Sequence, residues 1–181
     1  MAKTKLSAAA YVERGYAQVE PNHLSARRTG QIYAQLPAAA DIEVLENGQF
    51  AKYDYENNVV NFTGDGEWML VFNEIKLYDP REMNDHDFAM IKGNYSALVY
   101  DATGTEMPVD TNMVPRLLKT NVGDIWTTNA VNEAELAVGD VLSPAADGFL
   151  AKAGDGSIEI KVVKVYTMPD GQKGVKVQRI K

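Results

Sequence analysis

Residues 158–180, IEIKVVKVYTMPDGQKGVKVQRI, carry the clearest structural pattern in the chain. Apolar and charged residues alternate strictly over residues 158–162, which is the period of a strand with one buried and one exposed face. The phase of this alternation changes at Val163, and a β-bulge at that position would restore it. Residues 169–173 (PDGQK) predict a turn, and residues 175–178 predict a strand that pairs back. We therefore expect a C-terminal hairpin.

Two stretches upstream also predict hairpins. Residues 136–153 place Asp147–Gly148 between two apolar runs. Residues 41–55 place Asn47–Gly48 between DIEVLE and QFAKYDY. Asn-Gly between two such runs is a strong short-range hairpin signal, because a type I′ turn needs a positive φ at both central residues. We expect each pair of flanking runs to form paired strands.

The run Trp68–Phe72 (WMLVF) is apolar without interruption, so we expect a strand covered on both faces. Long helices are hard to place anywhere after residue 40, whereas turn signals recur regularly. These observations predict a mainly β protein. Its body, a small β-barrel or β-sandwich, would span residues 41–181 and follow an extended N-terminal arm over residues 1–40.

The N-terminal 40 residues lack a sustained period of either strand or helix, and Pro21, Gly30 and Pro37 interrupt them. Their apolar residues can anchor the segment but cannot form a core. Two interpretations remain open. The arm folds back over its own domain, or it lies on another subunit and becomes ordered on binding. The second interpretation predicts that residues 1–30 are sensitive to proteases in the isolated protein.

Charge divides the chain into three parts. Residues 1–40 carry five basic and two acidic residues, residues 41–110 carry four and fifteen, and residues 111–181 carry nine and eight. The net charges are therefore +3, −11 and +1, which add to −7. One interpretation is that the acids cover the outer faces of sheets and keep the protein soluble. The other is that the basic arm binds an acidic protein surface. An acidic body would repel phosphates, so we expect no direct binding to nucleic acid.

The chain lacks the residues that most catalytic mechanisms and metal sites require. The chain has no cysteine, which excludes disulfides, thiolate nucleophiles and Cys-ligated metals. Asp85–His86–Asp87 is the one cluster of metal-ligand types, and adjacent residues of a strand point to opposite faces. We expect a solvated loop there. Neither a nucleophile elbow nor a glycine-rich phosphate loop is present. We expect no cofactor, no metal and no enzymatic activity.

No apolar run approaches the ~20 residues of a membrane-spanning helix, and the first residues do not read as a secretory signal. A chain without cysteine suits synthesis in a reducing cytoplasm. We therefore expect a protein that is made in a reducing cytoplasm and does not bind membranes.

Four segments, which lie between residues 16 and 172, are similar to small structural proteins encoded among the head genes of tailed bacteriophages. The first resembles the hairpin of head decoration (capsid cement) proteins. The segments are VGDVLSPAADGFLAKA (138–153), YAQVEPNHLS (16–25), GEWMLVFNEIKLY (66–78) and YTMPDGQ (166–172).

This resemblance implies a cysteine-poor, mainly β protein without catalytic residues, located on the capsid surface of a virion. Decoration proteins bind the lattice of the major capsid protein, often as trimers and often through an N-terminal arm. A homo-oligomer, with a trimer as the expected form, follows from the same resemblance. The candidate residues for the interface with the capsid or with other subunits are Tyr11, Tyr16, Arg27, Arg28, Ile32, Tyr33 and Trp68.

Two other functions remain open at this stage. A connector or tail-completion protein would also be a small β protein without cysteine. A carbohydrate-binding or host-attachment module would use aromatic stacking surfaces, for which Trp68, Trp126 and the nine tyrosines are the candidates. Packing in a core is the competing interpretation for Trp68, because it begins an apolar run.

Overall fold

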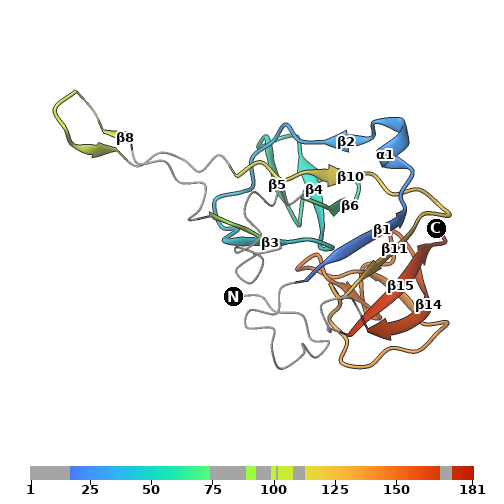
Figure 1. Cartoon of the computed structure of the whole chain (residues 1–181). Coiled ribbons are helices and arrows are strands. Elements are labelled where there is room, and N and C mark those ends of the chain that lie inside the picture. Colours follow the sequence, from blue (N-terminus) through green and yellow to red (C-terminus); the bar gives the residue numbers. More distant parts are fainter. Residues whose placement is uncertain (1–16, 74–88, 93–98, 101, 108–112, 168–172) are drawn as a thin grey trace.

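The computed structural model describes residues 17–73, 89–92, 99–100, 102–107, 113–167 and 173–181. Strands make up 41% of the described residues and helix 4%, which confirms the predicted mainly β fold. Two antiparallel sheets dominate the molecule, and the single described helix, α1 (Ala26–Thr29), lies at one corner (Figure 1). Among the described residues, no helix has the length and hydropathy needed to cross a membrane.

The larger sheet has six strands, and the C-terminal half of the chain supplies all but one of them. Its order is β1 (Val19–His23), β11 (Ile125–Thr128), β15 (Lys173–Arg179), β14 (Ile160–Thr167), β12 (Val141–Pro144) and β13 (Leu150–Ala151).

The second sheet has five strands, and two small strand pairs accompany it. The order of the sheet is β2 (Ile32–Tyr33), β10 (Leu117–Leu118), β6 (Met69–Val71), β4 (Phe50–Asp54) and β5 (Val59–Asn61). The small pairs are β3 (Val44–Glu46) with β7 (Ala89–Ile91) and β8 (Val99–Tyr100) with β9 (Glu106–Met107).

The C-terminal hairpin forms as predicted. β14 and β15 pair antiparallel along their length, and the register shifts between Val162 and Lys164, which confirms the bulge at Val163. Val165 lies opposite the buried Val175, but it stays 43% exposed. The hairpin predicted over residues 136–153 is confirmed too, since β12 pairs with β13 across a turn that holds Gly148 at φ +78°.

The predicted hairpin at Asn47–Gly48 is wrong. Gly48 has a φ of +93° and a turn forms, but Asn47 does not take the positive φ of a type I′ turn. The flanking strands do not pair with each other: β3 pairs with β7, while β4 pairs with β5 and β6. Asn47 and Gly48 are buried rather than exposed at a hairpin tip, and the Gly48 N–H donates to the Val71 carbonyl of β6 at 2.9 Å.

The strand in the Trp68–Phe72 run is covered on both faces, as predicted. Leu70 packs in a core between the two large sheets, together with Phe50 and the fully buried Trp126. Met69 and Val71 point to a second core on the other face of the five-stranded sheet. The five-stranded sheet therefore lies between two apolar layers.

The predicted boundary at residue 40 is wrong, because residues 17–40 belong to the sheets. β1 pairs with β11, β2 pairs with β10, and Ala17 and Leu24 are buried. The sequence pattern was misleading because β2 is two residues long and the register of β1 shifts between Glu20 and His23. Only residues 1–16 remain for a separate arm, and they lie outside the described residues.

Candidate functional site

A groove of about 170 Å³ lies beside α1, between the helix and the end of the five-stranded sheet. It is lined by Ile32 of β2, Leu118 of β10, Phe72 next to β6, and the two arginines Arg27 and Arg116, and its exposed lining is mostly polar. The guanidinium of Arg27 lies 6.0 Å from the centroid of the Phe72 ring, within the range of a cation–π contact.

Helix α1 is a single turn that a network of hydrogen bonds holds in place. Asp124, which is buried, accepts from the backbone N–H of Ser25 at 3.0 Å and from its hydroxyl at 2.9 Å. Asn121 donates to the Ser25 hydroxyl at 2.7 Å. Gly30 ends the helix at φ +70°, in the left-handed region that glycine tolerates, and turns the chain into β2. These contacts set the position of Arg27 above the sheet.

The opposite wall depends on pairing between β6 and β10. The Phe72 N–H donates to the Arg116 carbonyl at 2.9 Å, and the Arg116 N–H donates to the Asn73 side-chain oxygen at 2.9 Å. This continues the pairing of Leu117 with Val71 by one further residue on each strand. The backbone at Phe72 and Arg116 is thus well determined.

The structure separates the predicted interface residues into groups. Arg27 and Ile32 line the groove together. Arg28 is exposed on the same helix but does not line the groove. Tyr33 packs edge-on against Tyr53, with ring centroids 5.6 Å apart, on the other face of the sheet. Tyr11 and Tyr16 lie outside the described residues.

The predicted interface role of Trp68 is wrong, because this side chain is buried. It is 4% exposed, and its indole N–H donates to Asp155 at 2.5 Å. Lys52 Nζ lies 4.5 Å from the centroid of its ring. Burial acts to raise the pKa of Asp155, but the hydrogen bonds from Trp68 and Ser157 outweigh it and hold that pKa below its usual value. Trp68 is a core residue with a satisfied polar atom, as its apolar run already indicated.

Neither tryptophan offers a stacking surface to a sugar, since Trp126 is fully buried as well. The predicted basis for a carbohydrate-binding module is therefore wrong for both tryptophans. The cluster Asp85–His86–Asp87 lies outside the described residues. Within the described part of the chain, no group of three or more histidine, aspartate and glutamate side chains could hold a metal ion.

Sequence reasoning missed Phe72, Arg116 and Leu118. Each belongs to a short apolar or mixed run with no local sign of a surface role. Only the pairing of β6 with β10, which joins residues more than forty positions apart, brings them to the same groove as Arg27. No sequence signal could have found them without that pairing.

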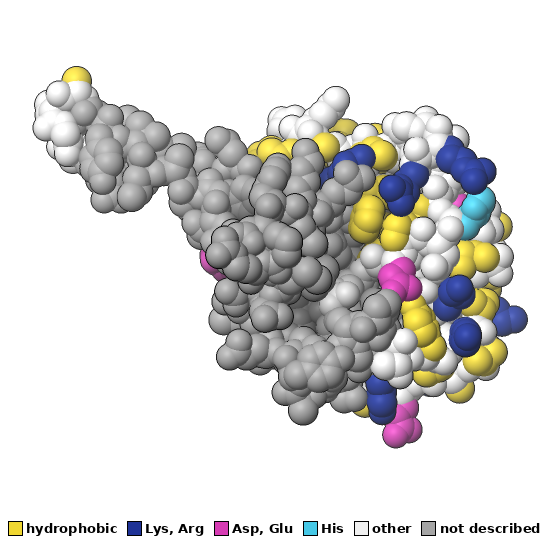
Figure 2. Space-filling view, viewed as in Figure 1, with side chains coloured by type: hydrophobic (Ala, Val, Ile, Leu, Met, Phe, Trp, Pro, Cys, Tyr) yellow, Lys and Arg dark blue, Asp and Glu magenta, His cyan; other side chains and the backbone are white. Residues whose placement is uncertain are grey.

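The corner around α1 is basic. Neither Arg27 nor Arg28 has a carboxylate partner within the described residues, whereas the nearby Lys119 is paired with Glu67 at 2.6 Å. That hydrogen bond raises the pKa of Lys119. Figure 2 shows basic side chains beside hydrophobic ones on the described part of this face. The exposed lining of the groove is mostly polar, and the Arg27 guanidinium there can bind a carboxylate of another protein.

The groove is also smaller than the roughly 300–1,000 Å³ of most small-molecule sites. It is suited to a side chain or two of a protein partner. Comparison with protein-family models, with curated proteins and with solved structures gave no match.

Proposed function

We propose that the protein is a structural component of a tailed-phage virion that binds the outside of the capsid lattice and reinforces it. In this proposal it is made in the host cytoplasm and then binds the major capsid protein. The observation that carries the proposal is the groove beside α1, whose exposed lining is mostly polar and where Arg27 has no carboxylate partner among the described residues. Such a surface fits an acidic segment of another protein.

The small size of the groove fits a role in which many copies act together. A stable pairwise interface buries about 800 Å² per partner, far more than one groove of this kind provides. Weak contacts become effective when a homo-oligomer, here proposed as a trimer, presents several of them to a regular lattice. Reinforcement then comes from the sum of the contacts across the joints between capsomers.

Two neighbouring arginines offer a matched test of the groove. Arg27→Glu reverses the charge over the groove floor, whereas Arg28→Glu makes the same change in charge one residue away, outside it. We expect R27E to lower the occupancy of the protein on expanded capsids at least about tenfold, and R28E to lower it much less. Equal losses for the two variants, or no loss for either, would contradict the assignment of the groove.

The proposed arm needs a shorter deletion than the sequence indicated. Removing residues 1–30 would delete β1 and α1, and with them a strand of the six-stranded sheet and the helix that carries Arg27. Removing residues 1–16 leaves both in place. We propose that Tyr11 and Tyr16 add to capsid binding, so this deletion should lower occupancy while the melting temperature stays within a few degrees of that of the full chain.

A further inference from the structure

The hairpin β14–β15 is strongly basic in an acidic protein. Its two strands, IKVVKVYT and KGVKVQR, contain five basic residues and no acidic residue, although the chain as a whole has a net charge of −7. Of these, Arg179 donates to the Thr120 carbonyl and so has a structural role. The remaining four are Lys161, Lys164, Lys173 and Lys176.

The register places like charges opposite each other. Lys164 lies directly across from Lys176, and both face away from the core into which Val162 and Val177 point. Like charges directly opposite in an antiparallel pair are destabilising. Lys161, opposite Gln178, extends the same basic face. We call the face formed by Lys161, Lys164 and Lys176 the lysine face.

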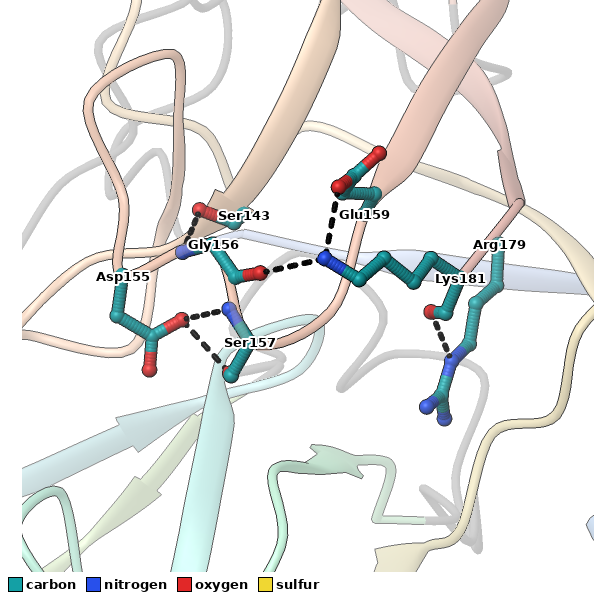
Figure 3. Close-up of polar contacts among 7 residues, drawn as sticks. All are labelled: Ser143, Asp155, Gly156, Ser157, Glu159, Arg179 and Lys181. Carbon is teal, nitrogen blue, oxygen red and sulfur yellow. Dashed lines mark hydrogen bonds and ion pairs between the residues drawn. The ribbon is translucent and has the colours of Figure 1, made fainter.

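The nearby carboxylates have other partners. Glu159 pairs with Lys181 at 3.0 Å, and Lys181 also reaches the Gly156 carbonyl (Figure 3). Glu20, on β1, accepts a hydrogen bond from the Tyr166 hydroxyl at 2.5 Å. Within the described residues, none of the lysines of the lysine face forms an ion pair. The fold thus keeps a row of positive charge that no carboxylate in the described part of the subunit neutralises.

A complementary surface lies on the same chain, in the part that builds the five-stranded sheet. Residues 41–67 carry seven acidic residues and one basic residue. Glu56 and Asp65 are both exposed, and neither pairs with a cation among the described residues. The Gly66 N–H donates to the Tyr53 carbonyl at 3.0 Å, which brings the loop around Asp65 to the β4–β5 turn that holds Glu56. We call this the acidic end.

We propose that the lysine face of one subunit binds the acidic end of a second copy of this chain. The occupant is argued from charge: a face of unpaired lysines and an end of unpaired carboxylates lie on different sheets of the same molecule, and they do not meet within it. The contact is head to tail, so a pair of subunits keeps one free surface of each kind, and repetition closes a ring if the rotation between subunits allows it. This inference does not depend on the capsid role proposed above.

Charge reversal on each surface in turn tests the contact, with self-association measured by sedimentation of the full chain. Wild-type protein should associate reversibly, with a dissociation constant that rises about tenfold or more between ~0.05 M and ~0.5 M NaCl. The double variant Lys164→Glu/Lys176→Glu should raise that constant at least about tenfold at low salt, and so should Glu56→Lys/Asp65→Lys.

The decisive step is to mix the two double variants. Each alone opposes like charges, but the mixture pairs every reversed surface with a complementary one, so association should return. A control, Arg28→Glu/Lys152→Glu, makes the same change in net charge as the lysine double variant but lies outside both surfaces, and it should associate like wild type. A monomeric wild type at low salt, association of either double variant like that of wild type, a mixture that stays monomeric, or a control that is equally defective would each overturn the proposal.

Discussion

The C-terminal hairpin and the turn at Asn47–Gly48 both carry hairpin signals, yet only the first joins paired strands. β14 and β15 pair from Ile160↔Arg179 to Thr167↔Lys173. β3 and β4, which flank Asn47–Gly48, pair with other strands. The difference teaches that turn chemistry specifies the conformation of the turn, whereas the partner of a strand is decided by the faces that it must bury.

The two regions differ in what surrounds them. The turn at Asn47–Gly48 is buried, and its polar neighbours bind segments far along the chain. Asn47 exchanges hydrogen bonds with Asn73, and Gln49 donates to the Asp147 carbonyl at 3.0 Å. Glu46, fully buried, accepts from the Ala17 N–H at 2.6 Å. The turn therefore joins distant parts of the fold, while the C-terminal hairpin depends on contacts within itself and with its sheet.

The largest effect on stability is expected from adding a side chain at Gly48, where no room is left for one. A Cβ there would lie 2.4 Å from Thr128 Oγ1 and 2.7 Å from Ala130 Cβ, at a φ of +93°. Gly48→Ala should lower the free energy of unfolding by about 4 kcal/mol, from backbone strain and overpacking together. Gly156→Ala is the matched control, since Gly156 also has a positive φ, +70°, but open space around it. Its expected cost in denaturant unfolding is about 1 kcal/mol. Equal costs would show that the turn is not packed as described.

The next effect is a pH dependence at Glu46. Burial raises the pKa of this carboxyl from 4.5 to about 7, against the opposing effect of the Ala17 N–H. The folded protein therefore binds a proton that the unfolded chain releases, so the free energy of unfolding falls as the pH rises from about 4.5 to about 7. Glu46→Gln should remove this fall. The stability of E46Q relative to wild type should increase by about 3 kcal/mol over that interval. A difference that is constant with pH would contradict the burial of an ionisable group at this turn.

A smaller effect distinguishes the two strands of the C-terminal hairpin. Val175 is fully buried, whereas Val165, its partner across the pair, is 43% exposed after the bulge. Val175→Ala should cost about 2 kcal/mol of unfolding free energy, and Val165→Ala about 0.5 kcal/mol. Comparable costs would mean that the bulge does not expose the end of β14.

The smallest expected effect is an increase in stability. Lys164→Thr removes one of two like charges that face each other across the hairpin, so it should raise the free energy of unfolding by about 0.5 kcal/mol at low salt. Lys161→Thr is the control, because Lys161 lies opposite Gln178 and relieves no repulsion. The difference between the variants should shrink as salt is added. An equal gain in unfolding free energy for both variants would contradict a repulsion between Lys164 and Lys176.

The parts of the fold that the sequence predicted are those in which local pattern and long-range packing agree. The alternation over residues 158–162 and the change at Val163 led directly to the paired strands and their bulge. Residues 17–40 were not predicted as part of the body, because β1 and β2 are stabilised by partners about a hundred residues further along the chain. The groove was found in part: Arg27 and Ile32 were candidates, while Arg116 required the pairing of β6 with β10.

The copy number of this chain in purified virions, determined by quantitative mass spectrometry against the major capsid protein, tests the proposed function most directly. A protein that covers the capsid lattice must be present in hundreds of copies per particle. A count of about six to twelve would instead match the symmetry of a connector ring and contradict binding across the lattice. Complete absence of the chain from virions would contradict a structural role altogether.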